Sequence, residues 1–114
     1  TILCTQATAD LMTIMLKDAA KLQEEEALFA FKRGYSKHAK PEPLFNEADA
    51  LNVLSMVRSY PMDKSIELLE HVSVMFRNTG HLLGSAFVTF TLEGHSQTKT
   101  IVFSGDVGRY DDPI

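Results

Sequence analysis

The chain has 114 residues with a formal net charge of −4, and 45% of its residues are hydrophobic while 23% are charged. This composition is typical of one globular domain or part of one, and it excludes a disordered chain. The acidic balance argues against a free-standing nucleic-acid-binding module, because such modules usually carry a basic surface. The lone Cys4 allows no internal disulfide, and no secretory signal or membrane-spanning run is visible. We therefore expect a cytoplasmic, intracellular protein with no membrane association.

The first part of the chain predicts a strand followed by a helix. Residues 1–4 form a short apolar run that is typical of a buried strand, and Thr5 or Thr8 is expected to cap the helix. Gly34 is expected to end this helix, and a break between Asp18 and Gln23 would bring its length closer to the usual range. The apolar residues that recur at helical spacing, and so predict its buried face, are Leu11, Met12, Met15, Ala19 and Leu22.

An exposed loop over residues 35–45 separates this helix from a second one. The basic run 37–40 has two interpretations, a phosphate contact or solvated surface lysines, and the second is the commoner for so short a motif. Asn46 is expected to cap the second helix in a capping box with Asp49. Leu51, Leu54 and Val57 are expected to form its buried face.

From residue 59 onward the apolar spacing changes from helical to alternating. Four strands are predicted, near residues 66–69, 72–76, 86–92 and 100–103, with a turn at Glu70 and His71 and a polar hairpin turn over 93–97. Strands that follow one another closely in sequence tend to pair antiparallel. The predicted fold class is α+β, with two helices packed on a mainly antiparallel sheet of about five strands.

Two glycine-rich turns carry the residues best suited to chemistry. His81 lies in the turn before the strand at 86–92, and Asp106 follows the strand at 100–103. If these strands are neighbours, the two side chains meet at one rim of the sheet. An imidazole and a carboxylate suit a zinc-type site, whereas each residue alone is better explained by an ordinary loop hydrogen bond. His38, His71 and His95 show no ligand spacing, and Cys4 is interpreted as a core residue.

These turns resemble motifs of a known family. Residues 80–86 (Gly-His-Leu-Leu-Gly-Ser-Ala) and 101–110 (Ile-Val-Phe-Ser-Gly-Asp-Val-Gly-Arg-Tyr) are similar to the third and fourth metal motifs of the metallo-β-lactamase superfamily, and most similar to its RNA-processing β-CASP branch. The strand-to-helix junction at residues 4–11 and the segments at 15–18, 23–25 and 43–49 resemble the same branch. The resemblance therefore covers nearly the whole chain.

The resemblance implies an αββα metallo-β-lactamase sandwich, present here in part, in which His81 is a terminal ligand of one zinc and Asp106 bridges two zinc ions. It implies a parent hydrolase, a ribonuclease in which a metal-activated hydroxide cleaves RNA phosphodiester bonds. The family's His-x-His-x-Asp-His motif and its β-CASP domain do not occur within residues 1–114. We therefore expect an internal part of the metallo-β-lactamase domain, with no catalytic residue of its own, weak or no zinc binding and no nuclease activity by itself.

Two other functions stay open at this point. The same fold class includes hydrolases of thioesters, lactones and lactams, and a catalytically dead relative could serve as an interaction module.

A part of such a sandwich would expose an apolar sheet face, and large exposed apolar patches drive association. We therefore also expect a homodimer or self-association through that face.

Overall fold

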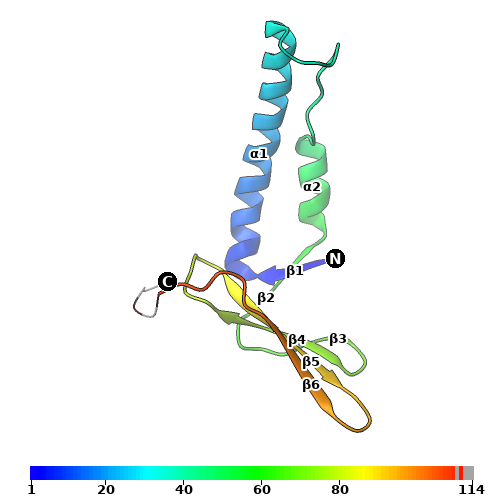
Figure 1. The fold of residues 1–114 in the computed structure, drawn as a ribbon, viewed down its shortest axis with the longest axis vertical. Helices are drawn as coiled ribbons and strands as arrows, with labels where there is room; N and C mark the ends of the chain where they lie inside the picture. Colours follow the sequence, from blue (N-terminus) through cyan, green and yellow to red (C-terminus); the bar gives the residue numbers. More distant parts are fainter. Residues whose placement is uncertain (110, 112–114) are drawn as a thin grey trace. The chain divides into compact units, whose positions relative to one another are not determined.

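The computed structural model describes residues 1–109 and 111, so Tyr110, at the end of the second motif, and residues 112–114 lie outside the described part. The elements follow one another as two helices and two sets of strands, which confirms the α+β class (Figure 1). They are β1 (Ile2–Thr5), α1 (Gln6–Arg33), α2 (Glu47–Ser55), β2 (Val57–Tyr60), β3 (Ile66–Leu69), β4 (Val72–Asn78), β5 (Ala86–Glu93) and β6 (Thr98–Phe103). Neither described helix has the long apolar stretch that a bilayer crossing would require.

The chain divides into two compact units. The helical unit comprises Thr1 and residues 10–57, and the sheet unit comprises residues 2–9 together with the chain from Arg58 onward. The packing of helices on the sheet, and with it the sandwich architecture, stays a prediction.

Helix α1 begins at a threonine cap, as expected. The hydroxyl oxygen of Thr5 accepts a hydrogen bond from the Thr8 backbone N–H at 3.3 Å, which satisfies one of the free donors of the first turn. The expected break is absent, because the helix continues for 28 residues to Arg33. Gly34 ends it with φ of 66° and a backbone hydrogen bond to Ala30 of 3.0 Å, the left-handed conformation that glycine adopts readily.

The prediction of a buried apolar face on α1 is wrong. Only Ala20 and Ala30 are buried on this helix, whereas Leu11, Met15 and Leu22 are all exposed. The physical reason is a lack of partners within the helical unit. A helix rises about 1.5 Å per residue, so the 9 residues of α2 can cover only part of the 28 of α1.

Helix α2 has the expected start and a different end. The Asn46 side chain accepts from the Asp49 backbone at 3.1 Å, and the Asp49 carboxylate accepts from the Asn46 backbone at 3.0 Å, which confirms the capping box. Val57 does not lie on the helix, because α2 ends at Ser55 and Val57 begins β2. Valine is β-branched and suits a strand as well as a helix, so the apolar spacing alone could not assign it.

The strands form two sheets within the described residues. Strands β3, β4, β5 and β6 pair in sequence order as an antiparallel meander, which confirms the four predicted strands, and β1 pairs with β2 in a separate two-stranded sheet. The sequence predicted a single sheet of about five strands. The described residues instead form six strands in two sheets, because β2 was not expected. Both predicted turns are present: His71 adopts φ of 64° between β3 and β4, and Gly94 bonds to Gln97 at 3.0 Å before β6.

One face of the meander is apolar. Val74 and Phe76 of β4 are buried, and Phe90 of β5 meets Phe103 of β6 edge-on with ring centroids 5.9 Å apart. These side chains, together with Leu3 and others, line an open groove of about 440 Å³. The sheet therefore has the beginnings of a core on this face, with much apolar surface left exposed.

Candidate metal centre

The loop that carries His81 connects β4 to β5 and is folded around Ser85. The Ser85 hydroxyl oxygen accepts from the Leu82 backbone N–H at 3.0 Å and lies 2.7 Å from the Thr79 hydroxyl. The Ser85 backbone N–H also donates to the Leu82 carbonyl at 3.0 Å. These local bonds close the loop into a compact turn, so that the position of His81 is set by its neighbours.

The same loop is held against the junction between β1 and α1. The carbonyl oxygen of Gly84 accepts from the Thr5 hydroxyl at 2.7 Å and from the Thr8 hydroxyl at 3.1 Å. Gly84 has φ of 85°, and a Cβ atom there would lie 2.8 Å from the Thr8 backbone nitrogen. Only glycine permits so close an approach. Thr5, which caps the helix, and Thr8, in its first turn, therefore also fix the histidine loop.

The second loop follows β6 and crosses over the first. The backbone N–H of Gly108 donates to the Thr79 carbonyl at 3.0 Å. A Cβ atom at Gly108 would overlap the carbonyl group of Gly80 and lie 2.6 Å from the backbone nitrogen of His81. The two glycine-rich motifs are thus in direct backbone contact, although 27 positions separate Gly108 from His81.

This contact places the two candidate ligands together. His81 Nε2 and Asp106 Oδ2 are 3.5 Å apart, and their side chains are 41% and 85% exposed. The pairing of β5 with β6 explains the convergence, because β5 follows the histidine loop and β6 leads into the aspartate loop. The expected meeting of these two side chains is therefore present in the structure, and their role as metal ligands stays a prediction.

The two donor groups, an imidazole and a carboxylate, suit zinc. Two donors are too few, however, to complete a zinc site. A neutral imidazole nitrogen and a carboxylate oxygen are both common zinc ligands, and a zinc site generally has at least three protein ligands. No cluster of three or more histidine, cysteine, aspartate or glutamate side chains that could hold a metal ion occurs within residues 1–109 and 111. His81 and Asp106 therefore fit part of a zinc coordination sphere.

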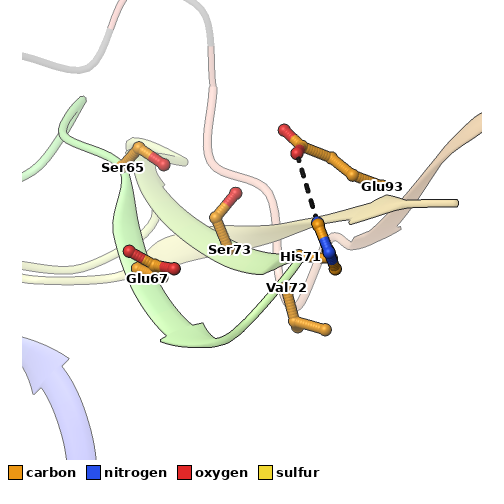
Figure 2. Close-up of a pocket in the computed structure, with 6 residues that line it drawn as sticks. All are labelled: Ser65, Glu67, His71, Val72, Ser73 and Glu93. Atoms are coloured by element: carbon orange, nitrogen blue, oxygen red, sulfur yellow. Dashed lines mark ion pairs between the residues drawn. The ribbon is translucent and has the colours of Figure 1, made fainter.

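A polar pocket lies at the turn between β3 and β4 (Figure 2). It has a volume of about 300 Å³, and His71 on its edge has Nε2 3.5 Å from Glu70 and Nδ1 4.0 Å from Glu93. All three side chains are more than half exposed. We interpret them as a solvated surface cluster, in agreement with the expectation for His71.

Cys4 is a core residue of β1 in the structure. It is 8% exposed, and burial raises the pKa of its thiol above the ordinary value. A thiol must lose its proton to bind zinc, so this environment favours the neutral form and opposes ligation.

Sequence reasoning found the two candidate ligands and missed most of their supports. One of Thr5 and Thr8 was expected to cap the helix, whereas the hydroxyls of both donate to the Gly84 carbonyl. The close approach of Gly108 to Gly80 had no signal beyond the presence of glycine at both positions. Such contacts depend on how distant loops meet, which a single sequence does not encode in any local pattern.

Comparison with known proteins gives two curated relatives, and no protein-family model matches the chain. The chain is 32% identical over 110 residues to ribonuclease TTHA0252 of Thermus thermophilus, covering 96% of this chain and 20% of that protein. It is 29% identical over 106 residues to an RNase J-like protein of Methanocaldococcus jannaschii, covering 93% of this chain and 20% of that protein. The chain thus spans about a fifth of the length of the curated relatives it matches. It is a relative of proteins named as ribonucleases along nearly its whole length.

Proposed function

We propose that residues 1–114 are an internal part of the metallo-β-lactamase domain of a zinc-dependent ribonuclease of the β-CASP branch. The observation that carries the proposal is the 3.5 Å approach of His81 to Asp106, since these are the two positions that match metal motifs of that family. The similarity to two ribonuclease-named proteins over more than nine-tenths of the chain supports the same assignment.

Within such a centre the two side chains have separate tasks. His81 offers a nitrogen donor from a loop that the Gly84 carbonyl ties to Thr5 and Thr8. Asp106 offers two carboxylate oxygens from a loop that Gly108 ties to Thr79. When bound, zinc supplies Lewis acidity toward the phosphodiester and the attacking water. The remaining ligands would come from a His-x-His-x-Asp-His motif, which residues 1–114 do not contain.

The experiment compares the complete gene product with its single variants His81→Ala and Asp106→Ala. A labelled RNA oligonucleotide is incubated with zinc, and thioester, lactone and lactam substrates are offered in parallel. We expect RNA cleavage by the unaltered protein, at least a hundredfold loss in either variant, and retained activity in His95→Ala. Hydrolysis of a thioester, lactone or lactam without RNA cleavage would favour a hydrolase of small molecules. A complete protein that cleaves none of these substrates would favour an interaction module.

Residues 1–114 alone should not cleave RNA, because two donors cannot hold the metal tightly.

We also propose that this chain associates with a second copy through its meander. On the apolar face of that sheet, Leu68 and Phe103 are 37% and 61% exposed, and both line the open groove of about 440 Å³. Large exposed apolar patches drive association. Light scattering should report a dimer or larger species, and a strict monomer at high concentration would contradict this proposal.

A further inference from the structure

Two hydroxyl groups close the base of the histidine loop. Asn78 and Ala86 are the last paired positions of β4 and β5, and Thr79 and Ser85 form the next step toward His81. The hydroxyl oxygens of Thr79 and Ser85 are 2.7 Å apart, whereas the Thr79 backbone N–H meets the Ser85 carbonyl at 3.4 Å. Hydrogen bonds from N–H are weak beyond about 3.2 Å, so the side chains contribute more than the backbone to closing this step.

The loop above this step depends on such bonds for a single conformation. It consists of residues 80–84, and its first and last residues are glycines with φ of 66° and 85°. Glycine loses more conformational freedom on ordering than any other residue. The Ser85 hydroxyl also accepts from the backbone N–H of Leu82 at 3.0 Å, and Leu82 directly follows His81. A bond next to the imidazole residue therefore depends on the Ser85 hydroxyl.

Thr79 contacts the aspartate loop as well. Its carbonyl oxygen accepts from the Gly108 backbone N–H at 3.0 Å. Thr79 lies two residues before His81, and Gly108 lies two residues after Asp106. Thr79 thus bonds to the base of the histidine loop through its hydroxyl and to the aspartate loop through its carbonyl. Both Thr79 and Ser85 are half-buried, where water competes less for their hydrogen bonds.

We propose that Thr79 and Ser85 are positioning residues of the candidate metal centre, because their hydroxyl pair couples the two loops and maintains the spacing of His81 and Asp106. Two donors that bind one tetrahedral zinc at about 2.0–2.1 Å lie about 3.3–3.4 Å apart. The present separation of 3.5 Å between Nε2 and Oδ2 is close to that value. The metal in this inference rests on the proposed function, whereas the coupling of the loops is a property of the metal-free chain.

The first test follows the coupling in the full chain with excess EDTA, by NMR of the backbone amides. Thr79→Val retains the shape of the side chain and removes the hydroxyl, and Thr79→Ser is the matched control that retains it. We expect Thr79→Val to shift the Leu82 and Gly108 resonances together and to speed their hydrogen exchange about fivefold, as expected for the loss of one hydrogen bond. Thr79→Ser should restore the unaltered behaviour.

A second control separates coupling from a general loosening of the histidine loop. Thr8→Val removes the 3.1 Å hydrogen bond from the Thr8 hydroxyl to the Gly84 carbonyl and leaves the Thr79 hydroxyl in place. This variant should shift the Leu82 resonance and leave that of Gly108 unchanged.

The second test measures the zinc affinity of the complete gene product by competition with a chelator, together with RNA cleavage over a series of zinc concentrations. Thr79→Val should weaken zinc binding about fivefold and raise the half-saturating zinc concentration by the same factor. The KM for RNA and the kcat at saturating zinc should stay within about twofold, whereas a general loss of folded protein would lower kcat at every zinc concentration. The double variant with Ser85→Ala should match Ser85→Ala alone within about twofold, since both changes break the same bond.

Three outcomes would overturn the proposal: an unchanged Gly108 resonance in Thr79→Val, an equal shift of that resonance in Thr79→Ser or Thr8→Val, and an unchanged zinc affinity in Thr79→Val. Circular dichroism confirms that each variant is folded, and Ser85→Ala measured at Gly108 decides the question if Thr79→Val does not fold. Coupled loops in a complete protein that binds no zinc would remove the zinc assignment and leave the coupling in place. Zinc binding with uncoupled loops would do the reverse.

Discussion

Replacement of Gly108 by alanine tests how the two loops of the candidate metal centre are held together. The added Cβ would overlap the carbonyl group of Gly80 and approach the backbone nitrogen of His81 to 2.6 Å. These are backbone atoms, so no change of side-chain rotamer relieves the overlap. The two loops must separate, and the 3.0 Å hydrogen bond from Gly108 to Thr79 is then stretched or lost.

The expected cost follows from these two effects. Overpacking a close contact costs about 1–3 kcal/mol, and loss of one backbone hydrogen bond costs about 1 kcal/mol net. We therefore expect Gly108→Ala to lower the free energy of unfolding by about 2–4 kcal/mol. Because His81 lies next to the overlap, we also expect its ring to move away from Asp106.

Urea unfolding and the NMR resonances of the His81 ring provide the assay. The matched control is Gly34→Ala, where φ is 66° and a Cβ atom would meet nothing within 4 Å, so the cost is that of the left-handed backbone alone, about 1 kcal/mol. The control should leave the His81 resonances in place. Unfolding of Gly108→Ala at the wild-type midpoint with unchanged His81 resonances would refute the account of the loop contact.

Three further predictions concern the sheet unit. Thr5→Val removes both the helix cap and the donor to Gly84, and it should destabilise the chain by about 1–3 kcal/mol in urea unfolding, with Thr5→Ser close to wild type. Phe76→Ala should cost about 3–5 kcal/mol, against less than about 0.5 kcal/mol for the exposed Val102→Ala, and similar values for the two would contradict the assigned core. Cys4 should react with iodoacetamide far more slowly in the native chain than in urea, since burial raises its pKa. Equal alkylation rates in the native and the urea-unfolded chain would contradict the burial of Cys4. The same raised pKa predicts that the contribution of the Cys4 thiol to the free energy of unfolding is present below about pH 8.5 and is lost as the pH rises further.

The parts of the fold that the sequence predicted depend on short-range chemistry. The capping box of Asn46 and Asp49 involves residues three positions apart, and the turn at His71 lies between two alternating apolar runs. The four meander strands follow from alternation and short connections. In each case the residues that decide the structure are close in sequence, so a local pattern was sufficient.

The parts that could not be predicted depend on long-range contacts. Leu11 and Met15 have helical apolar spacing and remain exposed, because the described part of the helical unit provides too little partner surface to cover them. Val57 became a strand residue through pairing of β2 with β1, which lies more than fifty positions earlier. The hydrogen bond from Thr5 to Gly84 spans 79 positions. For the candidate site, sequence reasoning identified His81 and Asp106, and only the structure revealed the backbone contacts that support them.

A titration of the full chain with zinc, followed by NMR of the backbone amides and histidine rings, tests the central claim most directly. If His81 and Asp106 form part of one metal centre, weak zinc binding should shift the resonances of both loops together, and either His81→Ala or Asp106→Ala should abolish those shifts, whereas His95→Ala should preserve them. Zinc shifts that spread equally over His38, His71, His81 and His95, or that survive the loss of Asp106, would contradict the assignment of a shared site.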